Sequence, residues 1–226
     1  MRKEGSRIIF LKRRALGVIS KSSSSSKKYL CYNSIMNKFS KIISGLTSPY
    51  LVIPVFSLVI IYHFADSLNQ FFIWSILLIA LSVIAPLLYI LISVKQNKVT
   101  DLHVYLKEQR EIPFLIAITG SILVLIIYYY LQVPRPLIAM MYALTINGTI
   151  FALLSRYWKL SMHAATFASS LTIVSMLVSS YWLILSPIII LIIWARLFRK
   201  RHTLFQLITA SILSPIITAI TILLLR

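Results

Sequence analysis

Basic side chains and a histidine gather where one long apolar run ends and the next begins. The segment WARLFRKRHTLFQ, Trp194 to Gln206, carries Arg196, Arg199, Lys200, Arg201 and His202. Guanidinium and ammonium groups bind phosphate oxygens, and a basic cluster at the edge of a hydrophobic span lies where lipid headgroups lie. The segment therefore indicates an anion site at a membrane surface.

A second, sparser cluster follows the same pattern. The segment RYWKLSMHA places Arg156, Lys159, Ser161 and His163 at the edge of another apolar run. Two of the chain's four histidines thus lie in similar settings. We expect the two clusters to meet at one phosphate-binding site if their loops share a face of the membrane.

The composition is that of an integral membrane protein. Hydrophobic residues make up 59% of the 226 positions and charged residues only 12%, with a mean hydropathy of +0.88, which excludes an ordinary soluble domain. Of the 23 Lys and Arg, 11 lie in residues 1–45 against one acid, Glu4. This distribution is typical of membrane orientation and of contact with anionic lipids, so we predict no nucleic-acid partner.

The chain divides into a tail and a membrane domain. Residues 1–45 are rich in Lys, Arg and Ser and are predicted to be a flexible cytosolic tail that contacts anionic lipids, and residues 46–226 to be a transmembrane domain. The tail's composition fits a transit peptide almost as well. Met36 is an alternative start, since MNKFSKIISG leads directly into the first span.

Seven apolar runs predict an all-α, polytopic transmembrane helix bundle of about six to seven spans. They cover residues 48–65, 71–94, 113–131, 137–155, 164–180, 182–196 and 204–225. As one helix, residues 164–196 would be ~50 Å long against a hydrocarbon core of ~30 Å. Two short helices broken near Ser179 to Trp182 fit better than one, with Ser186 and Pro187 in the first turn of the second.

The positive-inside rule gives one consistent topology. The N-terminus and the basic loops at residues 95–112, 156–162 and 196–203 face the cytoplasm, and the other loops carry only Arg135 among Lys and Arg. Seven spans then leave the C-terminus outside. We expect a multi-pass protein of the plasma membrane rather than of an organelle.

The basic clusters, in their order along the chain, resemble the motifs of the type 2 phosphatidic acid phosphatase superfamily. Its members are integral membrane phosphatases that act on lipid phosphates and isoprenoid pyrophosphates. Its third motif is Ser-Arg, five residues, His, three residues, Asp, and Arg196 and His202 stand in that register. LSMH, ending at His163, resembles its second motif, Pro-Ser-Gly-His. For the first motif, a Lys and an Arg-Pro, VYLKEQREIP offers Lys107 and Arg110 with a different spacing. The resemblance covers roughly residues 95–210.

The chain departs from the family at several motif positions. Gln206 stands where the family has Asp, Met162 where it has Gly, Leu160 where it has Pro, and Ala195 where it has Ser. The one literal Arg-Pro, at Arg135, falls on the outer face of the predicted topology, so Lys107 and Arg110 are preferred.

The resemblance implies that residues 46–226 form a transmembrane phosphatase-like domain that is metal-independent and needs no cofactor. By the family's mechanism, His202 attacks phosphorus to form a phosphohistidine, and His163 protonates the departing lipid alcohol. The phosphate would be held by Arg196, Lys159, Ser161, Lys107 and Arg110. Gln206, expected on one helical face with His202, would orient the imidazole as a neutral acceptor, which predicts a rate lower by ~10² to 10⁴ than with an Asp.

Two other functions stay open. The first is a noncatalytic member of the same fold that binds lipid phosphates or partner proteins, as Gln206 and Met162 suggest. The second is a small transporter component. The lack of acidic residues within the spans argues against this function. Arg199, Lys200 and Arg201 are interpreted as lipid anchors, and the mid-span pair Asn147 and Gly148 as a site of close helix packing.

Overall fold

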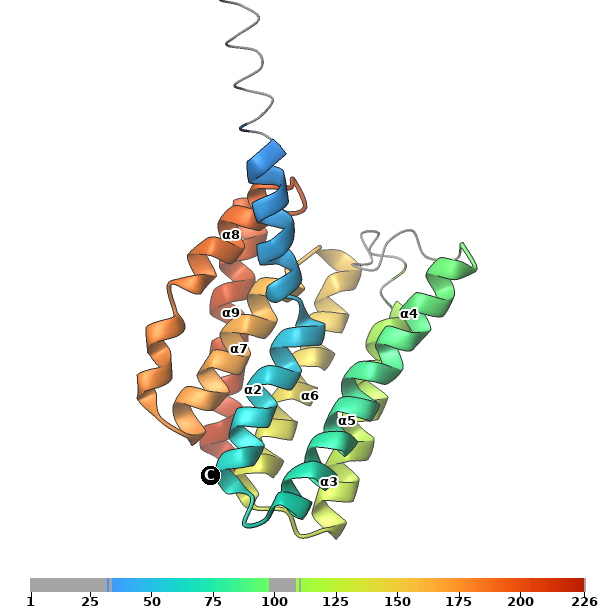
Figure 1. Ribbon diagram of the computed structural model, residues 1–226, viewed down its shortest axis with the longest axis vertical. Coiled ribbons are helices and arrows are strands. Elements are labelled where there is room, and N and C mark those ends of the chain that lie inside the picture. The colour runs from blue at the N-terminus through green and yellow to red at the C-terminus, as the bar shows by residue number, and fades with distance from the viewer. Residues whose placement is uncertain (1–31, 33, 98–108, 110, 226) are drawn as a thin grey trace, which may run out of the picture. The chain divides into compact units, whose positions relative to one another are not determined.

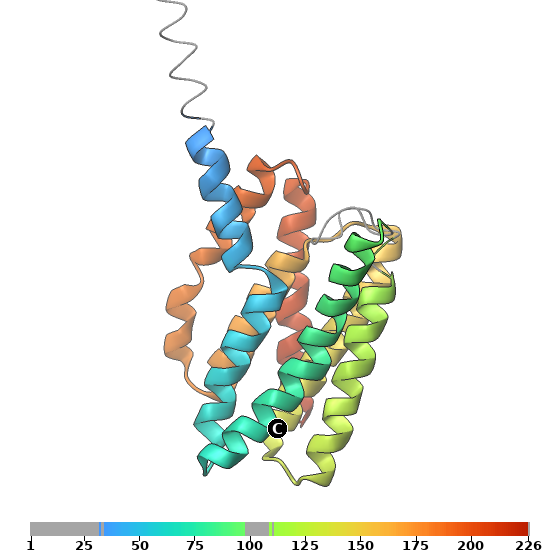
Figure 2. The same ribbon diagram turned by 45° about the vertical axis from the view of Figure 1, so that its right-hand side comes forward.

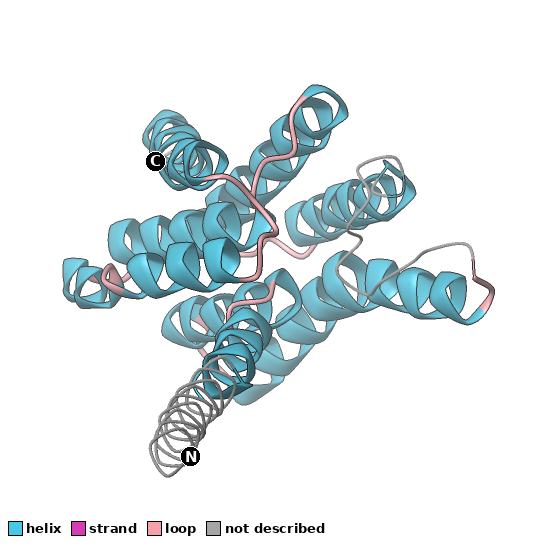
Figure 3. Ribbon diagram, turned by 90° about the horizontal axis from the view of Figure 1, so that it is seen from above, coloured by secondary structure: helices cyan, strands magenta, loops and turns pink. Residues whose placement is uncertain are grey.

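The protein is an all-α helix bundle. The structure, a computed structural model, describes residues 32, 34–97, 109 and 111–225, and every regular element within them is a helix (Figures 1 and 3). The predicted fold class is therefore confirmed. After a helix at Ser34–Leu46, the elements are α2 (Pro49–Phe64), α3 (Leu68–Ile79), η1 (Ala80–Ile84), α4 (Ala85–Lys95), α5 (Glu111–Tyr130), α6 (Arg135–Tyr157), α7 (Met162–Leu177), η3 (Ser180–Leu185), α8 (Ile188–Phe198) and α9 (Leu204–Leu225).

Five of the described helices are long and apolar enough to cross a membrane, as expected for a membrane protein, and six are if the bent pair Ser34–Leu46 and Pro49–Phe64 forms one span. All seven predicted apolar runs are helical. However, α2 and α7 have only 16 residues each, which at 1.5 Å per residue is ~24 Å, less than the ~30 Å of a hydrocarbon core. The number of candidate spans among the described helices is therefore lower than the seven apolar runs of the sequence.

Residues 164–196 are broken into two helices, as the length argument predicts. The helix α7 ends at Leu177, and the 3₁₀ turn η3 leads into α8. Pro187 is the residue before α8 rather than part of its first turn. Its fixed φ suits this position, where no preceding helical carbonyl needs its missing N–H.

The span that contains α3 and α4 is continuous but carries a π turn, η1. The N–H of Ala85 bonds the carbonyl of Ala80, five residues earlier, and the next residue, Pro86, has no N–H to donate. The carbonyl of Leu81 therefore receives no hydrogen bond from the backbone of Ala85 or Pro86, the residues four and five positions later. Helix α5 approaches this carbonyl closely, since a Cβ added at Gly120 would lie 2.1 Å from the Leu81 oxygen.

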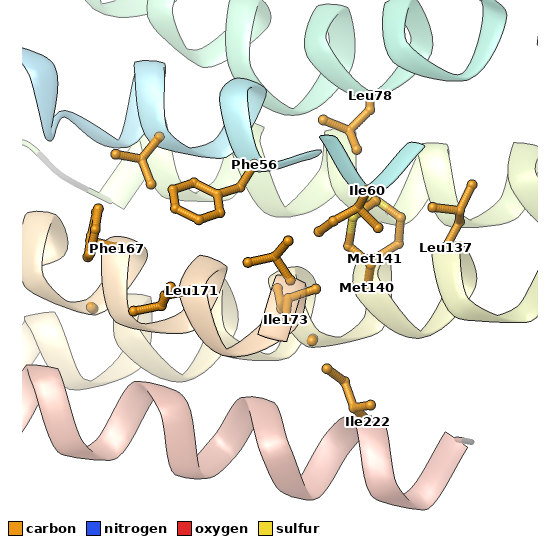
Figure 4. Close-up of a cluster of buried hydrophobic side chains, with 14 of the residues drawn as sticks. Phe56, Ile60, Leu78, Leu137, Met140, Met141, Phe167, Leu171, Ile173 and Ile222 are labelled. Atoms are coloured by element: carbon orange, nitrogen blue, oxygen red, sulfur yellow. The ribbon is translucent and has the colours of Figure 1, made fainter. Parts of the chain in front are cut away.

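Helix α7 is the most enclosed part of the bundle. Eleven of its 16 residues are buried, among them the small side chains Ala164, Ala165, Ala168, Ser169 and Ser170. It lies between α2 and α9 (Figures 1 and 2). Figure 4 shows Phe167 and Leu171 of α7 in the core beside Phe56 of α2, and the rings of Phe56 and Phe167 meet edge to face at 5.8 Å. In a bilayer the hydrophobic effect does not drive helices together, and small residues stabilise their association because they allow close packing.

The helix ends that flank the predicted basic loops lie at one end of the bundle. The ends of α4, α6 and α8 and the starts of α5, α7 and α9 are found there (Figure 1). This end, which we call the basic end, carries Lys95, Arg156, Lys159, Lys200 and Arg201. The arrangement is the one expected for the basic loops, and the assignment of this end to the cytoplasm stays a prediction.

Part of the predicted flexible tail is helical. Residues 34–46 form a helix, because Ile35, Phe39, Ile42 and Leu46 recur at intervals of three and four residues. The division into a flexible tail and a membrane domain at residue 45 stays a prediction. Residues 1–31 and 33 lie outside the described part of the chain.

Candidate functional site

A tight turn after α8 brings Arg196 and His202 together. Lys200 adopts a left-handed conformation with φ of 50°, its N–H bonds the Leu197 carbonyl at 2.8 Å, and the Arg201 N–H bonds the Arg196 carbonyl at 3.1 Å. These two bonds form a Schellman motif, which ends a helix and reverses the chain. The five-residue spacing therefore works through a turn, and His202 lies in the loop before α9.

The side chains of Arg196 and His202 are both buried, at 4% and 9% exposure. The Arg196 Nη2 lies 3.4 Å from His202 Nε2, and His202 Nδ1 lies 3.2 Å from the Lys159 carbonyl oxygen. A carbonyl only accepts and a guanidinium only donates, so these partners assign the hydrogen to Nδ1 and the lone pair to Nε2. The ring is thus held as a neutral imidazole whose Nε2 faces Arg196.

Gln206 contacts Thr203 instead of His202. Its Oε1 accepts a hydrogen bond from the Thr203 N–H at 3.1 Å, and Thr203 Oγ1 accepts from the Gln206 N–H at 3.3 Å. This reciprocal pair is a capping box at the start of α9. The expected shared helical face of His202 and Gln206 is wrong, because the helix starts at Leu204, after His202. The Lys159 carbonyl, rather than Gln206, orients the imidazole of His202.

The second cluster places His163 in the first turn of α7. Its Nε2 lies 3.1 Å from the Ser44 carbonyl oxygen, so this nitrogen carries the hydrogen. Ser161 precedes the helix as its N-cap, with Oγ accepting from the Ala164 N–H at 3.5 Å. Ser161 is completely buried and serves the helix end. Arg156 forms an exposed ion pair with Glu111 that joins α6 to α5.

The two clusters meet at one cavity. His163, Arg196 and His202 all line a cavity of about 180 Å³, together with Met162. Lys159 contributes its backbone carbonyl to the ring of His202, and the side chains of Lys159, Ser161 and Gln206 are not part of the cavity wall. Lys107 and Arg110, the expected first motif, lie outside the described residues.

The cavity continues into the bundle along walls that sequence reasoning did not assign. They are formed by α2, η1, α4, α5, α6, α7 and α9, with apolar residues such as Ile53, Val83, Phe114, Ile118 and Phe151. Serines and threonines also line it, among them Ser82, Ser121, Thr145, Thr166 and Ser169. Such hydroxyls in apolar spans are the signal from which these residues could have been found.

Asn147 joins helices at the inner part of this cavity. Its Nδ2 donates to Thr218 Oγ1 at 2.8 Å, and its Oδ1 lies 3.0 Å from Ser214 Oγ. Ser214 Oγ also lies 2.8 Å from the Ala165 carbonyl. These bonds link α6, α9 and α7 at Asn147, whereas close packing at Gly148 is not found among the described residues, because a Cβ added there would meet only Ile118 Cγ1, at 3.8 Å.

Among residues 32, 34–97, 109 and 111–225, no group of three His, Cys, Asp or Glu side chains is arranged to hold a metal ion. No protein-family model, curated protein or solved structure matches the chain. What the site does must therefore be inferred from its own geometry.

Proposed function

We propose that the protein is a membrane-embedded phosphatase that hydrolyses a lipid phosphate or isoprenoid pyrophosphate through a phosphohistidine on His202. One observation carries the proposal: Arg196, His202 and His163, from separate parts of the chain, line one cavity at the basic end. A guanidinium and two imidazoles in one enclosed site are the groups that phosphoryl transfer without a metal requires.

The guanidinium of Arg196 supplies the anion site. It is buried beside a neutral imidazole, and a cation in a medium of low dielectric attracts an anion far more strongly than it would in water. Its forked N–H groups match the oxygens of a phosphate. The apolar walls of the same cavity suit the hydrocarbon part of a lipid.

The imidazole of His202 is the nucleophile. With Nδ1–H donated to the Lys159 carbonyl, the Nε2 lone pair is directed toward the guanidinium that would hold the phosphate. The Nε2–P bond forms as the bond from phosphorus to the lipid oxygen breaks. Water then attacks the phosphohistidine, which releases phosphate and restores His202. A neutral carbonyl stabilises the positive imidazole less than a carboxylate would, so the reaction is expected to be slow.

His163 is the candidate proton donor for the leaving oxygen. Its Nε2–H is engaged with the Ser44 carbonyl, so the transferable proton of its imidazolium form would be on Nδ1. Position in the first turn of α7 and in the wall of the cavity supports this role. The proton then leaves with the lipid alcohol, and water restores it in the second step.

Phosphate release from lipid phosphate by purified protein tests the proposal. Wild type should release phosphate, and His202→Ala and Arg196→Lys should not. His63→Ala is the matched control, because His63 is exposed in the last turn of α2 and does not line the cavity. Equal release by wild type and His202→Ala would contradict the proposal. Binding of lipid phosphate without any release would favour the noncatalytic alternative.

A further inference from the structure

The cavity contains a hydroxyl group whose hydrogen has no acceptor among the described residues. This is Ser82 Oγ, which is enclosed in η1 and lines the cavity. Three other hydroxyls of the wall donate to carbonyls of their own helices: Ser121 to Ala117, Thr145 to Met141 and Ser169 to Thr166. The Ser82 hydroxyl has no such partner within the described part of the chain, and it lies in a π turn, where the register between side chains and preceding carbonyls is not that of an α-helix.

Ser82 lies deeper in the bundle than the phosphate site. Its backbone nitrogen is 3.4 Å from a Cβ added at Gly120, and Gly120 follows Glu111 by nine residues on α5, a rise of ~14 Å. Glu111 pairs with Arg156 at the basic end. A lipid whose phosphate lies at Arg196 would therefore reach Ser82 with its hydrophobic part.

We infer that Ser82 is a specificity-determining residue that donates a hydrogen bond to an acceptor on the hydrophobic part of the lipid phosphate. The inference rests on the proposed function. An enclosed hydroxyl without an acceptor is unfavourable, most of all within a span where bulk water does not compensate. An ester carbonyl at the start of an acyl chain supplies such an acceptor, whereas a prenyl chain has none at any depth. The π turn thus selects between the substrate classes that the catalytic residues treat alike.

A matched pair of substrates isolates this hydrogen bond. A diester phosphatidate and its dialkyl ether analogue, with equal chain lengths, share the phosphate and differ in the two carbonyls. Wild type should favour the ester lipid over the ether lipid in kcat/KM by about 3- to 10-fold, the range for one neutral hydrogen bond. Ser82→Ala should bring this ratio close to one by lowering kcat/KM for the ester lipid alone.

Ser75→Ala is the control variant. Ser75 lies in the same span, is buried, and also has a hydroxyl without a partner among the described residues, but it does not line the cavity. It should keep the wild-type preference for the ester lipid. An unchanged ratio in Ser82→Ala, or an equal loss of activity on both lipids, overturns the inference.

Binding measured on the same proteins separates this inference from the proposed function. The probe is the thermal stabilisation of purified protein by each of the two lipids. If wild type releases phosphate at equal rates from both and binds both equally, the role of Ser82 fails and the catalytic proposal stands. If no phosphate is released but the ester lipid binds more tightly in a Ser82-dependent way, the catalytic proposal fails and the role of Ser82 stands.

Discussion

At the residue scale, the site depends on which group fixes the imidazole of His202. The register of Arg196 and His202 could be predicted from sequence, and the structure brings these two side chains together. The role of Gln206 could not be predicted in this way, because positions 202 and 206 share a face only if both lie in one helix, and α9 starts at Leu204. The signal for a different outcome was present, since Thr203 followed three residues later by Gln206 is a capping-box pattern that starts a helix after His202.

This geometry predicts the result of Gln206→Asp. An acidic side chain at this position would cap α9 and not reach the ring, so activity should change far less than the ~10⁴-fold effect of an orienting carboxylate. Gln206→Ala should leave activity similar and lower the free energy of unfolding by about 0.5 to 1 kcal/mol through loss of the cap. Kinetics of phosphate release and detergent-based unfolding measure the two effects. A gain of orders of magnitude in Gln206→Asp would mean that the side chain does reach His202.

At the element scale, irregular backbone features position the site and shape its cavity. The Schellman turn at Lys200 returns the chain to Arg196, and the π turn at η1 places Ser82 in the cavity wall. Neither was predictable from the apolar periodicity, because a continuous apolar run is compatible with α-helix and π turn alike. The position of α7 was also hidden, since hydropathy does not separate a lipid-facing span from an enclosed one. Its alanines and serines were the available clue.

Gly120→Ala should disrupt the contact between α5 and η1. The added Cβ would lie 2.1 Å from the Leu81 oxygen, and backbone at this contact cannot rotate away as a side chain can. We expect the free energy of unfolding to fall by about 1 to 3 kcal/mol, the range for overpacking. Unfolding in mixed detergent micelles measures it.

Gly148→Ala is the matched control for this prediction. It also lies in a span, but its added Cβ would meet only Ile118 Cγ1, at 3.8 Å. Stability should stay the same or rise slightly through helix propensity. Equal losses in the two variants would show that α5 and η1 do not approach as described.

Helix α5 ends in a second Schellman turn, which offers a stabilising substitution. Gln132 has φ of 51°, a left-handed conformation that strains residues with a Cβ, and it is exposed. Gln132→Gly should raise the free energy of unfolding by up to about 1 kcal/mol, and the β-branched Gln132→Val should lower it. Thermal unfolding of the three proteins tests the order, and a loss of stability in Gln132→Gly would contradict it.

At the scale of the whole molecule, the described helix ends that carry basic residues lie at one end of the bundle, and the candidate site lies there too. Sequence could predict this much, because the order of the apolar runs and the charge of the segments between them are read directly from it. It could not predict the number of true spans, since the 16-residue helices α2 and α7 are apolar but short.

The charge distribution predicts the orientation of the bundle. The basic end should face the cytoplasm, and α9 ends at the opposite end of the bundle from the basic end (Figure 1). A reporter fused after Arg226 that is active only outside the cytoplasm should therefore be active. A cysteine in place of Lys200, at the basic end, should be labelled only from the cytoplasmic side. The reverse pattern would place the site on the outer face.

The central claim is that His202 becomes phosphorylated during turnover. Wild type mixed with lipid phosphate labelled in its phosphate group and quenched in alkali should carry an acid-labile phosphate, and peptide mapping should place it on His202. His202→Ala should carry none, while His163→Ala should accumulate or lack the label according to which step it limits. Phosphate release by wild type with no label on His202, or equal labelling of His202→Ala, would contradict the account.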